Sequence, residues 1–333
     1  MLYKLLEKSK CFFKKHAKSK VTAFVVAGGI FLVSIAVVCL VGSQLRDPVR
    51  EPKKFGATYM TMNNPYFRVM NNAIEEAVEA NGDILITRDP AQDQEKQNSE
   101  IQEMIDEGVC AIFLNPVDWE AVKPALIACR NANIPVFNID TYVYDRGYVT
   151  SIIASDNYQA GVQCAEDLMK RQSQADIVIL NCPKMQSIRD RIQGFKDTIK
   201  KNPNFRVVAE ESGEGELEVA MNAMNKILHS GVSFNVIMGG NDPTALGALA
   251  ALQKNHWDTA IIYGVDGSPD AKNLIKEGLL VGTSAQYPSD IGTTAVQIAY
   301  DYLAGKSVPK NVTIPVTLIT KSNLNDFDIN GWQ

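Results

Sequence analysis

Histidine and cysteine, the side chains that most often carry metal or covalent chemistry, are scarce in this 333-residue sequence. Only three histidines and six cysteines are present, and no two cysteines form a C-x-x-C pair. This scarcity argues against a metal site and against a disulfide framework, so we predict neither a metal nor a cofactor. Four cysteines beyond residue 50 have no histidine nearby in the sequence, and we expect them to be buried thiols: Cys110, Cys129, Cys164 and Cys182.

Basic residues are the minority in most of the chain. Residues 21–333 hold 26 lysines and arginines against 37 aspartates and glutamates, a net charge of −11. A nucleic-acid-binding domain usually carries a positive patch and a high isoelectric point. The charge balance therefore argues against nucleic acid as a partner.

Charge of either sign is missing from residues 21–42, a 22-residue apolar run. An apolar helix of roughly 20 residues is long enough to cross a bilayer. Residues 1–20 carry seven lysines against one glutamate, and such a basic flank stays on the cytoplasmic side. We therefore predict a cytoplasmic basic leader at 1–20, a transmembrane anchor or signal sequence at 21–42 and a polar linker at 43–54.

Two other interpretations of this leader stay open. A cleaved signal peptide would use Val41 and Ser43 as the small flanks of its cut, but such peptides usually have an apolar region of about 7–15 residues. A lipoprotein leader would end at Cys39, but Val37 and Val38 are larger than the residues that usually precede a lipidated cysteine. We favour the uncleaved anchor, which places the protein at the cell membrane with its binding domain on the extracytoplasmic side.

The stretch Phe55–Phe67, FGATYMTMNNPYF, predicts a strand, a polar turn and a helix in succession. An apolar run is followed by Asn63 and Asn64, and Pro65 suits the first turn of a helix. In an open parallel sheet, ligands bind outside the carboxyl ends of the strands, which is where these asparagines and the aromatic Tyr66 would lie. The same residues would also suit a helix cap and a core, and that interpretation stays open beside the functional one.

Strands and helices alternate along the rest of the chain, which predicts two α/β lobes, each built on a doubly wound parallel sheet. Asn115 and Asp140 follow successive strands at a separation of 25 residues, and Asn241 and Asp266 repeat that pattern at the same separation. Two matched pairs indicate two lobes of like topology whose strand ends face a common cleft. We expect lobes of 53–154 with 287–316 and of 155–286 with 317–333.

Seven motifs stand in order along this chain: NNPYF, LNPVD, SDN at Ser155–Asn157, RDRIQGF, GGNDPTALGALAAL, YGVDGSPD and SAQYP. Together they resemble the motifs of periplasmic sugar-binding proteins of the ribose and galactose type. The family has the type I periplasmic binding protein fold, which the effector domain of lac-type repressors shares. The resemblance covers about residues 53–318 and implies two lobes that close on a sugar by hinge motion, with crossings near 154–155, 286–287 and 316–317.

The resemblance also implies the sugar contacts. Carboxylates accept hydrogen bonds from sugar hydroxyls, amides and guanidinium groups donate them, and aromatic rings cover apolar C–H groups. The chemistry of the residues at the matching positions agrees with these roles. The implied ligand-binding residues are Asn64, Tyr66, Phe67, Asn115, Asp140, Arg191, Asn241, Asp266 and Gln286.

Two departures from the family pattern affect the choice of sugar. Many ribose-binding proteins have an arginine directly after the residue that matches Asp140, and here Thr141 stands there. An aromatic residue expected near Gly215 is also absent. We expect Tyr142 or Tyr144 to refill the space, or the ligand to be larger than a pentose.

The resemblance implies a protein that captures a monosaccharide and delivers it to the permease of an ABC-type importer. The alternative is a membrane-tethered co-receptor that reports sugar to a histidine kinase or chemoreceptor, which the uncleaved anchor favours. A transcriptional repressor is disfavoured, because an apolar span stands where a DNA-binding headpiece would be. An enzyme is disfavoured too, since no serine or cysteine has an evident histidine partner and the resemblance makes Asp140 and Asp266 hydroxyl acceptors.

The predicted anchor can be tested on protein extracted from membranes. Because residues 21–42 form an uncharged span without a good cleavage site, mass spectrometry should find the lysine-rich peptides of residues 1–20 still attached. A mature chain that starts near Gln44, or a lipid on Cys39, would reject the anchor.

Overall fold

The computed structural model describes residue 29 and residues 31–35, 50–257 and 259–333. The chain divides into two units, Met1–Glu51 and Pro52–Gln333. In the first unit residues 29 and 31–35 are helical, and several of their large apolar side chains are exposed, whereas residues 50 and 51 have no regular structure. Among all described residues, no helix combines the length and the apolar character that a membrane span requires. Most of the predicted span 21–42, all of the predicted leader 1–20 and residues 43–49 of the predicted linker lie outside the described residues.

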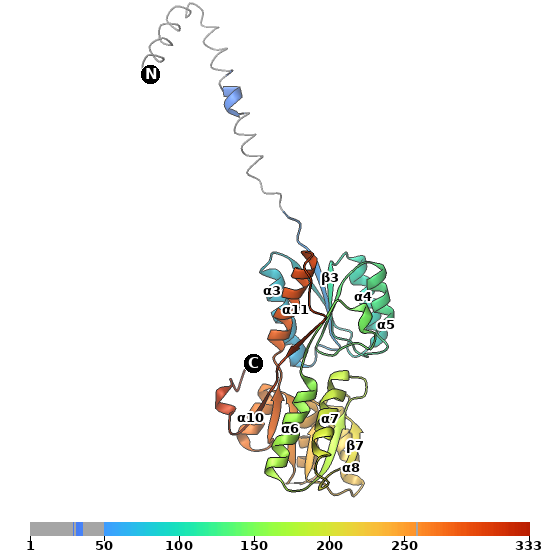
Figure 1. The fold of residues 1–333 in the computed structure, drawn as a ribbon, viewed down its shortest axis with the longest axis vertical. Helices are drawn as coiled ribbons and strands as arrows, with labels where there is room; N and C mark the ends of the chain where they lie inside the picture. Colours follow the sequence, from blue (N-terminus) through green and yellow to red (C-terminus); the bar gives the residue numbers. More distant parts are fainter. Residues whose placement is uncertain (1–28, 30, 36–49, 258) are drawn as a thin grey trace, which may run out of the picture. The chain divides into compact units, whose positions relative to one another are not determined.

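Pro52–Gln333 contains two six-stranded sheets with helices on both faces of each (Figure 1). The first sheet is parallel throughout, as predicted, with the strand order β11-β5-β4-β3-β1-β2. Helices α3 and α11 cover one face and α4 and α5 the other. The bounds are β1 Lys54–Thr58, α3 Pro65–Glu79, β2 Ile84–Arg88, α4 Gln94–Asp106, β3 Ala111–Leu114, α5 Lys123–Asn131, β4 Val136–Ile139, η1 Arg146–Tyr148, β5 Ser151–Ser155, α11 Pro288–Leu303 and β11 Asn311–Ile314.

The second sheet has the order β12-β10-β9-β8-β6-β7. Side chains of β6 alternate between its two faces: Ile177 and Ile179 pack with α6 and α7, whereas Val178 and Leu180 pack with α8, α9 and α10. The bounds are α6 Asn157–Arg171, β6 Ala175–Asn181, α7 Gln186–Ile199, β7 Phe205–Ser212, α8 Leu217–His229, β8 Val236–Gly239, α9 Asp242–Lys254, β9 Ile261–Asp266, α10 Pro269–Glu277, β10 Gly282–Ala285, β12 Thr317–Thr320 and η2 Leu324–Asp326.

The second sheet is mixed, so the prediction of two purely parallel sheets was wrong in this lobe. Strand β12 runs antiparallel to β10, with Thr317 opposite Ala285. The reason lies in the connection. Strand β11 belongs to the first sheet, and only residues 315–316 separate it from β12. The chain thus enters the second sheet at the end where β10 leaves it, and it must run in the opposite direction.

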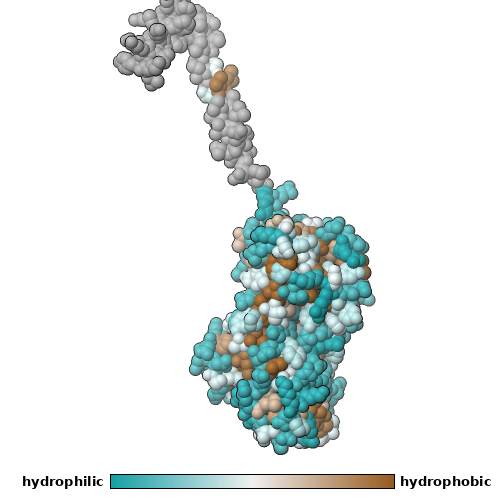
Figure 2. Space-filling model, viewed as in Figure 1, coloured by the Kyte–Doolittle hydropathy of each residue, from teal (hydrophilic) through white to brown (hydrophobic). Residues whose placement is uncertain are grey.

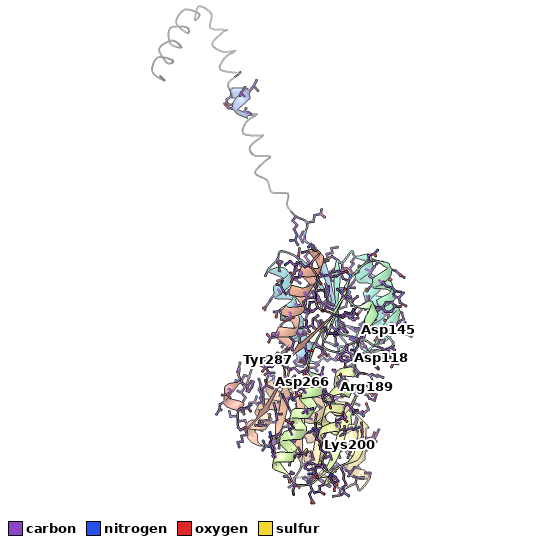
Figure 3. The ribbon with its side chains drawn as sticks, viewed as in Figure 1. Asp118, Asp145, Arg189, Lys200, Asp266 and Tyr287 are labelled. Atoms are coloured by element: carbon purple, nitrogen blue, oxygen red, sulfur yellow. The ribbon has the colours of Figure 1, made fainter. Side chains whose placement is uncertain are left out.

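The chain passes between the two sheets three times. It leaves the first sheet after β5, returns through residues 286–287 between β10 and α11, and passes to the second sheet again between β11 and β12. Tyr287, labelled in Figure 3, lies at the second passage, and its hydroxyl is 3.0 Å from Thr317 Oγ1 at the third. Two neighbouring passages are therefore joined by a side-chain hydrogen bond.

Helix α5 begins at Lys123, several residues after the turn at Asp118. Residues 119–122, which precede the helix, are in a turn. The Asp118 carboxylate accepts hydrogen bonds from the backbone N–H groups of Glu120 and Ala121, both at 2.9 Å, and this holds the preceding residues in a turn. Local side-chain bonding thus delays the helix.

Apolar side chains collect in the interiors of both lobes, and the face of the molecule in Figure 2 is largely hydrophilic over Pro52–Gln333. Three of the predicted thiols belong to these interiors, since Cys129, Cys164 and Cys182 are buried and free. Burial raises the pKa of Cys129 to about 12 and that of Cys182 to about 11. These thiols remain protonated, and therefore weakly nucleophilic, at neutral pH.

Helices α6 and α7 approach each other closely enough to require glycine at the contact. A Cβ atom on Gly161 would lie 1.8 Å from the carbonyl oxygen of Arg191, and one on Gly194 would lie 2.1 Å from that of Tyr158. Backbone atoms cannot move aside as a flexible side chain can. The crossing therefore depends on both glycines, and it positions the backbone of Arg191.

Replacing Gly161 by alanine should force the two helices apart. We expect Gly161→Ala to lower the free energy of unfolding by about 1–3 kcal/mol, the usual cost of overpacking an interior. Urea denaturation followed by circular dichroism measures this. Gly147→Ala is the matched control, because a Cβ atom there has no neighbour within 4 Å. Equal stability of the two variants would show that the helix contact is not tight.

Candidate functional site

Six of the nine predicted ligand-binding residues follow the carboxyl ends of strands. Asn115 follows β3 and Asp140 follows β4 in the first sheet. In the second sheet, Asn241 lies just beyond β8, Asp266 is the last residue of β9, and Gln286 follows β10. The sixth, Asn64, lies in the turn after β1. Parallel strands thus bring residues that are far apart in the sequence to one end of each sheet.

Asp140 is the centre of the polar cluster on the first lobe. Its carboxylate accepts hydrogen bonds from Asn115 Nδ2 at 3.0 Å, from Tyr66 Oη at 3.1 Å and from Thr141 Oγ1 at 3.1 Å. The side chain is 2% exposed, and burial raises its pKa against the opposing effect of the Arg191 guanidinium. Its position is well defined because every contact comes from a neighbour that is itself buried.

Arg191 and Asp266 form the corresponding cluster on the second lobe. The guanidinium donates to Asn157 Oδ1 at 2.7 Å and to the carbonyl oxygen of Gly240 at 2.9 Å, and its Nη1 atom lies 3.5 Å from Asp266 Oδ1. Gln286 Nε2 donates to the same carboxylate oxygen at 2.8 Å. The guanidinium is thus held in place by groups other than its charge partner.

Tyr66 joins the two clusters. Its hydroxyl lies 3.1 Å from Asp140 Oδ1 and 3.2 Å from Gln286 Oε1, and Gln286 in turn bonds Asp266. A phenol has one proton to donate, so these two acceptors compete for it. Burial, together with the charge of Asp140, raises the pKa of Tyr66 well above its usual range, and the phenol stays neutral.

Both central aspartates have a backbone conformation that residues other than glycine rarely adopt. The φ angle is +61° at Asp140 and +145° at Asp266. Positive φ at a residue with a side chain costs free energy and is concentrated at functional sites. The equal spacing in the sequence therefore identified two positions with the same unusual property, although nothing in the sequence indicated the strain.

The remaining predicted residues border a cavity of about 400 Å³ between the lobes. Asn64 and Asn241 cap helices α3 and α9, accepting from Tyr66 N and Thr244 N at 3.0 Å each, so the capping interpretation is correct and coexists with a place on the cavity. Phe67 packs against Tyr66, with ring centroids 5.4 Å apart. The predicted residues that line the cavity are Asn64, Phe67, Asn241 and Asp266.

The other five predicted residues, Tyr66, Asn115, Asp140, Arg191 and Gln286, form the buried network just described and do not line the cavity. Several other residues that line the cavity were not predicted from the sequence. Gln92 lies in the turn after β2, where the same strand-end rule would have indicated it, but Trp332 lies far from any strand end and had no such signal. Both line the cavity, as do Ser268 and the acidic residues Glu214, Glu216, Glu218 and Asp270.

Neither tyrosine expected to refill the missing aromatic position does so. Tyr142 bonds Asp190 through its hydroxyl and stacks on Arg146, whose guanidinium carbon lies 4.2 Å from the ring centroid. Tyr144 is 62% exposed and packs against Trp119. Both lie after the turn at Asp140. They contact charged or aromatic neighbours at the edge of the first lobe and do not line the cavity.

Direct bonds between the lobes surround the site. Thr141 Oγ1 lies 2.7 Å from Ser187 Oγ, and Gln92 Nε2 donates to Glu216 Oε1 at 2.9 Å. The Arg189 guanidinium, labelled in Figure 3, lies over the ring of Trp119 at 4.9 Å. Thr141, which stands where many ribose-binding proteins have arginine, thus serves as an uncharged link between Asp140 and the second lobe.

This arrangement offers hydrogen-bonding groups and aromatic side chains at one cavity. Within residues 50–257 and 259–333, no group of three or more histidine, cysteine or carboxylate side chains is placed to hold a metal ion. The cavity volume lies in the range of sites for small molecules, roughly 300–1,000 Å³. The chemistry present is recognition of a small polar ligand.

A family model for the periplasmic binding protein domain matches residues 55–307. The chain belongs to this family. It is 31% identical over 268 residues to the ribose import binding protein of Bacillus subtilis (strain 168), a match that covers 80% of this chain and 87% of that protein. The family consists of solute-binding proteins rather than enzymes.

Solved structures agree with the assignment to periplasmic binding proteins. An ABC transporter solute-binding protein from Bacillus halodurans C-125 with bound myo-inositol has a TM-score of 0.77 and 25% identity, over 82% of this chain and 96% of that one. The binding protein of the arabinose ABC transporter from Shewanella sp. ANA-3, bound to L-arabinofuranose, has a TM-score of 0.77 and 26% identity, over 82% of this chain and 94% of that one. The two-lobed type I fold predicted from the sequence is therefore confirmed.

Loss of the proton that Asp266 binds should make the ligand-free protein less stable as the pH rises. Burial, together with the charge of the nearby Asp242, raises the pKa of Asp266 to about 8 against the lowering effect of Arg191. An unfolded aspartate has a pKa of about 3.9, so folding takes up a proton between about pH 4 and pH 8. The contribution of this group to the free energy of unfolding is fully present below about pH 4 and is lost as the pH rises through about 8.

Thermal unfolding of the ligand-free protein at pH 5 and pH 8 tests this. The melting temperature of Asp266→Asn, which has no proton to lose, should fall less between the two values than that of the wild type. Asp118→Asn is the control, because Asp118 holds a turn outside this cluster. An equal fall in all three proteins would show that Asp266 does not bind a proton on folding.

Proposed function

We propose that this protein captures a monosaccharide between its two lobes outside the cytoplasm and presents it to the permease of an ABC-type importer. Family membership supports the fold and the class of ligand, and the relatives named above are an import protein for ribose and solute-binding proteins solved with a cyclitol or a pentose. The observation that carries the proposal is the chain of hydrogen bonds from Asp140 through Tyr66 and Gln286 to Asp266, because it links polar groups of both lobes at one cavity.

The nine residues of the sequence prediction have distinct roles in this proposal. Asp140 and Asp266 accept hydrogen bonds from sugar hydroxyls, and Arg191, Asn115 and Gln286 donate or accept according to the hydroxyl they meet. In this structure these groups bond one another, so a sugar would exchange bonds with them as the lobes part and close again. Asn64 and Asn241 contact the ligand at the helix starts, and Phe67 and Tyr66 cover its apolar face.

The passages between the sheets support the domain boundaries that we propose. We assign 53–154 with 287–316 to the first lobe and 155–286 with 317–333 to the second, with the three passages as the hinge. Hinges of a few residues at element ends are the usual means of closing such lobes on a ligand. The hydrogen bond between Tyr287 and Thr317 would keep two of the three passages moving together.

We also propose that residues 21–42 anchor the protein in the membrane, which supports a second candidate function. A tethered binding protein does not need to diffuse between partners, and it could report sugar to a membrane histidine kinase or chemoreceptor instead of an importer. The observation that favours this alternative is the 22-residue uncharged span after a basic leader. Crosslinking in membranes with and without sugar, followed by identification of the captured partner, separates a permease from a kinase.

The ligand itself can be identified by a thermal-shift screen against ribose, arabinose, apiose, myo-inositol and xylitol. A ligand that binds the native state raises the free energy of unfolding by about 2.7 kcal/mol when its concentration is 100 times its Kd. The proposed function fails if none of these or other small sugars shifts the melting temperature.

Removing Arg191 or Asp266 should abolish tight sugar binding. Each removal leaves desolvated partners unpaired in the closed cleft, which costs more than the net value of the lost bond. We expect Arg191→Ala and Asp266→Ala to weaken binding by at least about 2–4 kcal/mol, roughly 30- to 1000-fold. Isothermal titration with the sugar found in the screen measures this.

Asp118→Ala is the control for this titration, because Asp118 lies in a comparable turn but does not line the cavity. Circular dichroism should show that all three variants are folded. Affinity near that of the wild type for the Arg191 and Asp266 variants would mean that the sugar binds elsewhere.

A further inference from the structure

The segment Asp328–Gln333 reaches the cavity, although it follows the last strand of the second sheet by eight residues. Trp332 lines the cavity together with Phe67 and Gly215. Its ring lies edge-on to Tyr66, with centroids 5.8 Å apart and an interplanar angle of 62°. A tryptophan of the second lobe therefore touches the aromatic pair of the first.

A buried lysine holds this segment in place. Lys272 Nζ donates to the carbonyl oxygens of Asp328 and Gly331, both at 2.6 Å, and to Gln333 Oε1 at 3.2 Å. The lysine is fully buried, and it is seldom that a lysine is buried without dedicated partners. All three donors of the ammonium group are thus used: two bind backbone carbonyls that precede Trp332, and the third binds the side chain of Gln333, which follows it.

The same segment contacts the backbone of two residues that are predicted to bind the sugar. Gln333 Nε2 donates to the carbonyl oxygens of Asp266 at 3.1 Å and of Gln286 at 2.9 Å. Room for this contact requires glycine at position 267, where a Cβ atom would lie 2.4 Å from Gln333 Nε2 and where φ is +76°. The segment is therefore part of the structure of the site and does not merely lie near it.

The part of the cavity wall around Gly215 has no aromatic side chain. Gly215, with φ at +75°, stands near the place where the family pattern would have a ring, and the neighbouring lining residues Glu214 and Glu216 are acidic. Among the residues that line the cavity, only Phe67 and Trp332 are aromatic. Two aromatic side chains at one small cavity are suited to a ligand that has a ring with apolar C–H faces.

We propose that Trp332 supplies the second aromatic wall of the sugar site, and that the site consequently selects cyclic sugars and cyclitols over acyclic polyols. Lys272 acts as a positioning residue for Trp332. The proposal rests on the proposed function, since it specifies the class of sugar. An acyclic polyol offers the same hydroxyls but no rigid apolar face, so it gains little from the indole.

The decisive experiment is isothermal titration of the wild type, Trp332→Ala and Trp332→Phe with D-ribose, L-arabinose and myo-inositol as cyclic probes and xylitol as the acyclic probe. The strongest cyclic probe should bind Trp332→Ala about 10- to 100-fold more weakly than the wild type, the value of one buried aromatic contact. Trp332→Phe should recover most of the affinity. Binding of xylitol should change by no more than about threefold, because it makes little use of the ring.

Fluorescence separates a lost wall from a damaged fold. In a protein whose single tryptophan is Trp332, made by Trp119→Phe and Trp257→Phe, the cyclic probe should shift the emission and protect it from acrylamide. Adding Lys272→Met should make Trp332 more accessible to acrylamide before any sugar is added. It should also selectively weaken the binding of the cyclic probe. Trp257→Phe alone is the control for unchanged binding, because Trp257 stacks on Phe234 and does not line the cavity.

Three results would overturn the proposal: wild-type affinity of Trp332→Ala for the cyclic probe, equal losses for cyclic and acyclic probes, or no response of Trp332 fluorescence to bound sugar. The fluorescence result also decides the case in which Trp332→Ala does not fold. If the wild type binds none of the probes and no other sugar, the proposed function itself is wrong. That outcome differs from one in which a sugar binds without the help of Trp332.

Discussion

Three buried carboxylates lie in the field of one buried guanidinium, and much of this structure follows from that imbalance. Arg191 lowers the pKa of Asp140, Asp242 and Asp266, but burial raises all three by more. Isolated buried charges are costly, so the excess negative charge is relieved by protons and by neutral donors such as Tyr66 and Gln286. A neutral ligand rich in hydroxyls supplies the same kind of donor, which is the physical basis for sugar recognition here.

The guanidinium is effective only because its helix is placed accurately. Helix α7 crosses α6 at two glycines whose missing side chains allow backbone to meet backbone, and the carbonyl of Arg191 lies at that contact. From there the side chain reaches Asn157 and Gly240 before it meets Asp266. The packing of two helices in the second lobe thus determines the electrostatics of the cleft.

The second lobe also contributes a wall that its sheet does not provide. The ordinary elements end with β12 and η2, yet the chain continues to Trp332 and Gln333, whose contacts to Lys272 and to the backbone of Asp266 bring it back to the cavity. Thr141 links Asp140 to Ser187 through its hydroxyl, and Trp332 reaches the cavity from a distant segment.

The sequence alone determined the α/β class, the two lobes, the parallel first sheet and the places of the polar residues, because strand periodicity and strand ends are local features of a chain. Asn115, Asp140, Asn241 and Asp266 could be found by their spacing for that reason. The antiparallel β12, the positive φ of both aspartates and the bonding of Tyr66 to Gln286 depended on contacts between remote segments. Trp332 shows the difference most clearly: no local pattern marks it, and it reaches the cavity through its packing against Tyr66 and through the hydrogen bonds of Lys272 to the residues around it.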